Sequence, residues 1–158
     1  MKGLFVENVV TVNGISPVAD IYNGNPASDV VNLKEHGNVV FQLFQKTAGT
    51  NTGTATVTVM AASSAASSNA AAVVFKYQKK TTGASSVYGA LTAATTSGFV
   101  TTANEDTIYN ICVDAADLPD GKPYVYLKLT ETVNDPVTGA VLIHLYNARY
   151  SNPNDVLA

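Results

Sequence analysis

The sequence predicts an all-β protein, a two-sheet antiparallel β-sandwich of the jelly-roll-like kind. Apolar and polar residues alternate over about eight short segments, and a period of two is typical of strands with one buried face. Stretches rich in Gly, Pro, Asn and Ser separate these segments at short, regular spacing. No segment carries an apolar stripe at helical spacing, and no repeat of constant length indicates a propeller or a solenoid.

The N-terminal segment, residues 1–28, is predicted to be an extended arm. It contains a short strand candidate at residues 9–12, followed by turn signals from two Asn-Gly pairs and from prolines. Such a segment buries little core by itself, so we expect it to lie against its own body or against a neighbouring subunit. A strand candidate at residues 29–33 then begins the sandwich domain, which we place at residues 29–148.

The alternation is clearest over residues 38–61, in two runs on either side of a Gly/Thr/Asn-rich reversal at residues 48–53. Because turn-forming residues join two runs of similar length, this segment is predicted to be a long antiparallel hairpin. Val39, Phe41 and Leu43 share one register of the first run, and Ala55, Val57, Val59 and Ala61 share one register of the second.

Further strands follow the hairpin. Residues 63–72 are rich in Ser and Ala but have no apolar stripe, so we expect a loop there. Residues 114–121 are expected to form a single turn followed by a Pro-Asp-Gly reversal. Residues 149–158 are expected to be an extended C-terminal tail. The predicted strands are residues 73–78, 87–93, 107–113, 122–132 and 140–148. Val73, Phe75 and Tyr77 share one face of the first of these strands. The residues expected to face the core are Tyr109, Ile111, Val113, Val125, Leu127, Leu129, Val141, Ile143 and Leu145.

The chain is unusually poor in charge. Its 158 residues suit one domain, 46% of them are hydrophobic and only 13% are charged. The net charge of −3 argues against a surface that binds nucleic acid or anionic lipid, and the basic run at residues 76–80 is read as a solvated strand end. Two explanations for the scarce charge stay open: a Thr- and Tyr-rich β-surface, or an exterior covered by other subunits.

Nothing in the sequence indicates a reaction. Cys112 is alone, so it forms no internal disulfide, and we expect it to be a small buried side chain. His36 and His144 have no partner at metal-ligand spacing, and the acidic run within residues 114–121 lacks the oxygen spacing of a calcium loop. There is no Gly-x-Ser-x-Gly elbow and no phosphate-binding loop. We therefore predict no catalytic residue, no cofactor and no metal. With no signal peptide and no apolar membrane span, we expect synthesis in a cytoplasm-like compartment.

Tyrosine gives the candidate contact surface. The last two long strands place Tyr124, Tyr126, Leu142, His144 and Tyr146 in the register opposite the core. If these strands pair, they form an aromatic outer face, which we interpret as a subunit or capsid contact because aromatic side chains add large area at low entropic cost. The alternative is that this face packs against a loop or the N-terminal arm of the same chain.

The order of four segments carries a resemblance. LKEHGNVVFQLFQKTAGTNTGTATVTVMAAS, VVFKYQKKTTG, DLPDGKPYVYLKLTE and GAVLIHLYNARY follow one another over residues 29–150. In the order of its strands and in their local sequence, the chain resembles the head decoration, or cement, proteins of tailed bacteriophages.

The resemblance implies a sandwich or jelly-roll protein that binds the outer surface of the capsid shell. It would bridge capsomers as an oligomer, with the major capsid protein and copies of itself as partners. Its place would be in the virion, assembled in the host cytoplasm. No short motif exists from which binding residues could be transferred.

A second hypothesis is a carbohydrate- or receptor-binding β-sandwich of a phage tail or fibre. Surface tyrosines can stack on sugars, although the sequence has no Trp and no acidic cluster beside its tyrosines. Another structural subunit of the head or tail with the same fold is a third reading. Localisation on head or tail and a glycan array would separate these classes.

Overall fold

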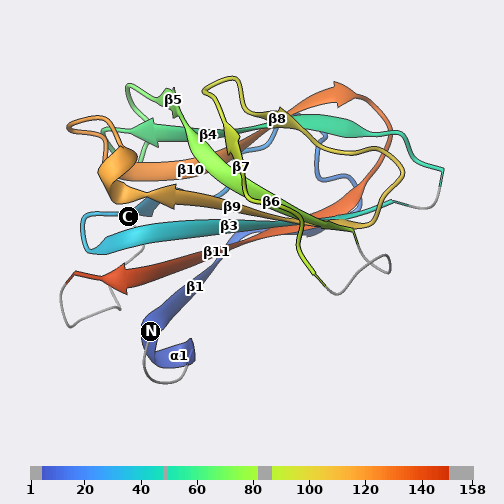
Figure 1. Ribbon diagram of the computed structural model, residues 1–158. Coiled ribbons are helices and arrows are strands. Elements are labelled where there is room, and N and C mark those ends of the chain that lie inside the picture. Colours follow the sequence, from blue (N-terminus) through green and yellow to red (C-terminus); the bar gives the residue numbers. More distant parts are fainter. Residues whose placement is uncertain (1–4, 48–49, 82–86, 150–158) are drawn as a thin grey trace.

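The computed structural model describes residues 5–47, 50–81 and 87–149. They form two antiparallel sheets that pack face to face (Figure 1). The predicted fold class, an antiparallel two-sheet β-sandwich of jelly-roll-like kind, is therefore confirmed.

The larger layer, sheet A, has six strands within the described residues, in the order β1-β11-β3-β9-β6-β7. A short helix, α1 (Phe5–Asn8), precedes β1. Because the order is not sequential, segments distant in the chain are hydrogen-bonded neighbours at the centre of this sheet. The bounds in this spatial order are Val9–Val18, Thr138–Ala148, His36–Lys46, Thr107–Asp114, Phe75–Thr81 and Thr92–Ala94.

The smaller layer, sheet B, has five strands in the part of the chain that is described. Four follow the order β2-β10-β4-β5, and β8 also pairs with β4. The chain reaches β10 from β9 through a single 3-10 turn, η1 (Ala115–Asp117), as the sequence predicted. The bounds of β2, β10, β4, β5 and β8 are Val31–Asn32, Tyr124–Val133, Thr54–Ala62, Ala71–Val73 and Phe99–Val100.

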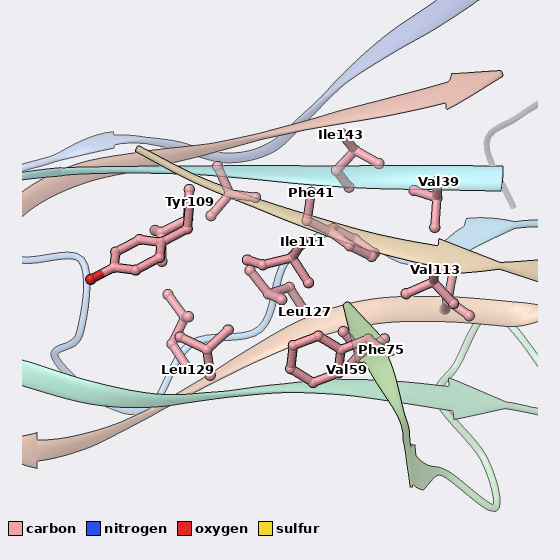
Figure 2. Close-up of a cluster of buried hydrophobic side chains, with 14 of the residues drawn as sticks. Val39, Phe41, Val59, Phe75, Tyr109, Ile111, Val113, Leu127, Leu129 and Ile143 are labelled. Atoms are coloured by element: carbon pink, nitrogen blue, oxygen red, sulfur yellow. The ribbon is translucent and has the colours of Figure 1, made fainter. Parts of the chain in front are cut away.

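The core lies between the sheets. Figure 2 shows Phe41 and Ile143 from sheet A facing Leu127 and Val59 from sheet B. Every residue predicted to face the core is buried, and so are the shared registers of β3 and β4. Of Val73, Phe75 and Tyr77, only Tyr77 is half-buried. Burying an aliphatic or aromatic side chain of this size contributes roughly 1.5–3 kcal/mol, so this alternation is the main source of stability.

The hairpin predicted for residues 38–61 is wrong. Both strands exist, but β3 pairs with β11 and β9, whereas β4 pairs with β10, β5 and β8 in the opposite sheet. Two successive strands that each have one buried face can be neighbours in one sheet, or they can lie in opposite sheets and face each other across the core. The alternation is the same in both arrangements, so the sequence pattern could not distinguish them. The chain crosses between the sheets near Gly53, where a Cβ atom would lie 2.0 Å from the Asp135 carbonyl oxygen.

Several strand boundaries also differ from the prediction. The strand expected at residues 73–78 is divided at Val74, because the chain passes there from β5 in sheet B to β6 in sheet A. The strand expected at 87–93 is β7, at Thr92–Ala94. Residues 99–100, which lie outside every predicted strand, form β8 and pair with β4. There the Phe99 ring stacks on Tyr77, with ring centroids 3.9 Å apart and planes 6° apart.

Residues 9–28 differ from the extended arm that was expected. Strand β1 has ten residues and pairs with β11, and its Val10 and Val12 pack against the core. Farther along, Ile21 and Tyr22 are 0% exposed. This segment lies on its own body because its apolar residues complete the edge and one end of the sandwich. Of the predicted C-terminal tail, residues 150–158 lie outside the described residues.

Candidate functional site

The residues predicted to form one contact face lie on two different sheets. Tyr124 and Tyr126 belong to β10 in sheet B, whereas Leu142, His144 and Tyr146 belong to β11 in sheet A. The two strands do not pair, so the condition on which the shared aromatic face depended is not met. Tyr126 is only 8% exposed, and Tyr124 is half-buried with the Lys34 ammonium 5.9 Å from its ring centroid.

The three residues on β11 instead belong to a broad surface, which we call the outer face of sheet A. It consists of the residues of β1, β11, β3 and β9 that alternate with the buried ones, and most of them are half-buried. Its registered rows run across the strands; one row is Thr11, His144, Val40 and Cys112. The members are Val9, Thr11, Val40, Gln42, Phe44, Ile108, Asn110, Cys112, Ala140, Leu142, His144 and Tyr146.

This outer face is apolar and uncharged over most of its area. Burial lowers the pKa of His144, so its imidazole is neutral at pH 7. Burial raises the pKa of the Cys112 thiol and of the Tyr146 hydroxyl, which keeps both protonated. Charged side chains lie at its margin: Asp114 and Lys46 at the ends of β9 and β3, and Lys76 and Lys80 on β6, opposite Cys112 and Ile108.

The polar side chains on this face bond to one another. The Gln42 Nε2 atom donates to Asn110 Oδ1 at 3.0 Å, and the Thr11 hydroxyl lies 3.1 Å from His144 Nδ1. Because these groups already bond to each other, a partner that covers the face does not leave them as buried donors and acceptors without a hydrogen bond. This matters because each buried group left unpaired costs about 1–3 kcal/mol.

Helix α1 forms a shallow wall at one side of the face. The Phe5 ring meets the His144 ring edge-on, with centroids 6.1 Å apart. A hollow lies between α1 and the sheet, and its lining is largely apolar and amide in character. The lining residues are Phe5, Val9, Val40, Gln42, Asn110, His144 and Tyr146.

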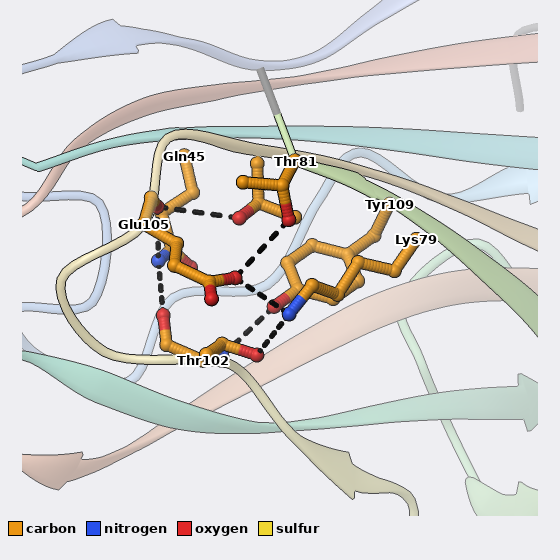
Figure 3. A network of polar contacts seen from close by, with 7 residues as sticks. Gln45, Lys79, Thr81, Thr102, Glu105 and Tyr109 are labelled. Carbon is orange, nitrogen blue, oxygen red and sulfur yellow. Dashed lines mark hydrogen bonds and ion pairs between the residues drawn. The ribbon is translucent and has the colours of Figure 1, made fainter. Parts of the chain in front are cut away.

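A second polar cluster closes one end of the sandwich (Figure 3). Gln45 accepts a hydrogen bond from the Tyr22 hydroxyl at 2.6 Å and donates to the carbonyl oxygens of Thr102 and Glu105. The Lys79 ammonium lies 2.6 Å from a Glu105 carboxylate oxygen, and that contact lowers the carboxyl pKa. These bonds tie the loop before β9 to the sheets, which is a structural role.

The histidine and acidic residues considered as ligands do not converge. His36 is 1% exposed, and burial lowers its pKa, so it is a neutral core histidine. Asp114 caps η1 by accepting from the Ala116 N–H at 2.9 Å, as expected for a turn. The described residues contain no group of three His, Cys, Asp or Glu side chains that could hold a metal ion. No helix in the described ranges has the length and hydropathy that crossing a bilayer requires.

Sequence reasoning missed most of the outer face of sheet A. Val40 and Phe44 are outward residues of β3 and Ile108 occupies the same register on β9, but the apolar character of this register was not used. Cys112 was expected to be buried; it is half-buried because its register places it outward. The signal was present in the alternation: on three adjacent strands, residues of both registers are largely apolar.

We compared the chain with protein family models, with curated proteins and with solved structures, and none of these comparisons found a match. The resemblance to decoration proteins therefore stays a prediction from the sequence.

Proposed function

We propose that this protein is a virion structural protein that binds the outer surface of a phage capsid shell and stabilises it by bridging capsomers. The observation that carries the proposal is the outer face of sheet A, an uncharged apolar surface on a molecule with few charges anywhere. The resemblance to decoration proteins, which the order of the sequence segments carries, is the second support for the proposal. The proposed partners are the major capsid protein and further copies of this chain.

The chemistry of the face suits a shell contact. Apolar area removed from water contributes about 25 cal/mol per Å², and a face without ionised groups avoids the cost of desolvating charge. Binding through such a face should change little with salt concentration, because screening acts on charges. Many copies on one shell would add weak contacts through multivalency.

The glycan-binding alternative rests on surface tyrosines that could stack on sugars. Tyr124 and Tyr126 lie on sheet B and Tyr146 lies on sheet A, so the three tyrosines do not form one platform. Tyr146 shares its face with Leu142 and Val40, and the Gln42 and Asn110 amides on that face already bond to each other.

The test is a binding experiment with purified phage shells that lack this protein. We expect electron microscopy to show added density on the outer surface after incubation with the wild-type chain. Leu142→Glu should reduce the bound copies at least about tenfold, because it places a charge within the apolar face. Thr130→Glu, at an exposed position on sheet B, is the matched control and should bind like the wild type. Wild-type protein that adds no density to shells, or that binds a glycan array instead, would contradict the proposal.

A further inference from the structure

The edges of the two sheets are unequal. Within the described residues, sheet B ends in β2 and β5, which have two and three residues, and one edge of sheet A is β7, which has three. Short edge strands offer little backbone for another chain to pair with. The remaining edge is β1, which has ten residues and lies along the lower margin of the molecule in Figure 1.

The free part of this edge is its first half. Val9–Asn13 pairs with β11 in unbroken register, and shifts in the register begin only after Asn13. In the second half, the Gly14 carbonyl accepts from the Asp29 N–H at 2.9 Å, and Pro17 has no N–H to donate. Between Val10 and Asn13, the backbone groups on the open side have no hydrogen-bond partner among the described residues.

We infer that two copies of this chain join by antiparallel pairing of β1 with β1, about a two-fold axis at Thr11. Two six-stranded sheets then become one continuous sheet. Isologous contacts of this kind are the commonest in homo-oligomers, and an unpaired strand is a template for another strand.

The segment is complementary to itself. About an axis at Thr11, Val10 lies opposite Val12 of the partner subunit, and Val9 lies opposite Asn13 of the partner subunit. No charged residue occurs in Val9–Asn13, so no like charges meet, and β-branched pairs across strands are favourable. Val10 and Val12 pack against the core but are only half-buried. Pairing would cover these two valines and extend the core across the axis.

The ends of β1 add apolar area in the same arrangement. Phe5 and Val6 of α1 are 57% and 79% exposed, and Val18 at the other end of β1 is 42% exposed. Antiparallel pairing places α1 of each copy at the Val18 end of its partner. A strand from a different protein would match one copy of the edge, but only a second copy supplies this match at both ends.

The pairing has a consequence for the shell. A two-fold axis perpendicular to the sheet keeps both outer faces of sheet A on the same side, so the dimer presents one doubled apolar surface. The use of that doubled surface for bridging capsomers rests on the proposed function. The pairing itself is measured without shells, so its failure and the failure of shell binding are distinguishable.

The test is the mass in solution by sedimentation velocity. Wild-type protein is expected at twice 16.5 kDa. Thr11→Lys and Thr11→Glu each place like charges opposite one another at the axis, and each should weaken association at least about tenfold. An equal mixture of the two variants should recover the dimer, because opposite charges then meet. Thr11 is exposed, and Thr130→Lys on sheet B is the matched control that should keep the wild-type mass.

Two results would overturn the inference, and a third would move the axis away from Thr11. One is wild-type protein that stays at 16.5 kDa up to about 100 μM. The edge of β1 would then be unpaired in solution, or it would pair with a strand of a shell protein. The other is a pair of Thr11 variants that retain the wild-type mass although circular dichroism shows that both are folded. Mixing the variants without recovery of the dimer would also argue against an axis at Thr11.

Discussion

Sheets A and B are alike on the faces that they turn toward each other and unlike on the faces that they turn outward. On the inside, Phe41 of sheet A and Leu127 of sheet B are both 0% exposed. On the outside, sheet A presents Val40 and Leu142 in its central strands. The corresponding rows of sheet B pair Thr58 with Lys128 and Thr56 with Thr130.

The difference shows that inward and outward positions of a strand are constrained by different requirements. An inward position must be apolar whatever the protein does, because the core supplies its stability. A single apolar residue at an outward position is ordinary, but a contiguous group of them indicates a surface that a partner or local packing covers. The outer face of sheet B is therefore a reference surface for the outer face of sheet A within the same molecule.

The largest expected loss of stability comes from core substitutions, which test whether the inner faces of the two sheets contribute equally. Phe41→Ala and Leu127→Ala should each lower the free energy of unfolding by about 2–5 kcal/mol, because each leaves a cavity at a fully buried position. Chemical denaturation monitored by circular dichroism measures this. The control is Thr58→Ala on the outside of sheet B, expected to change stability by less than about 1 kcal/mol. A small loss for one of the two core variants would show that the sheets do not share the core equally.

The next effect compares the same substitution on the inside and the outside of one strand. Gln45→Leu removes the acceptor of the buried Tyr22 hydroxyl and should cost about 1–3 kcal/mol of unfolding free energy. Gln42→Leu, on the outer face of β3, removes a half-buried bond to Asn110 and should cost less than about 1 kcal/mol. Equal losses in denaturant titrations would contradict the inward and outward assignment of these positions.

A third prediction exchanges the character of the two outer faces. Leu142→Thr makes the outer face of sheet A more polar, and Thr130→Leu makes that of sheet B more apolar. Both should leave the unfolding free energy within about 1 kcal/mol of the wild type. On a hydrophobic-interaction column, Leu142→Thr should elute earlier and Thr130→Leu later than the wild type. Unchanged elution of Leu142→Thr would mean that the outer face of sheet A is not available to a partner.

The smallest effect concerns the ion pair at the end of the sandwich. Because the hydrogen bond from Lys79 lowers the pKa of Glu105 below that in the unfolded chain, the pair stabilises the fold above about pH 4.3 and loses this contribution as pH falls through the lowered value. Both side chains are partly solvated, so Lys79→Met should cost only about 0–1 kcal/mol at pH 7. The difference between wild type and variant should vanish toward pH 2 in acid denaturation curves. A difference that persists at pH 2 would show that Lys79 acts through packing.

Much of the candidate site could be predicted one strand at a time. The register of Leu142, His144 and Tyr146 on β11 was read correctly from the alternation, and all three are outward residues. The grouping of these residues with Tyr124 and Tyr126 failed, because it assumed that consecutive strands are neighbours. The surface that replaces it joins four strands from distant parts of the chain.

The sequence by itself determined the long strands and most of their buried residues, because side-chain direction in a strand alternates locally with a period of two. Only the tertiary structure decided that β3 and β4 face each other across the core and that β1 lies at an open edge. Neighbouring strands are joined by backbone hydrogen bonds between distant segments. Backbone groups are the same in every residue apart from proline, so they leave no local signal of which strands pair. The composition of each outer face therefore depends on pairings that no local pattern encodes.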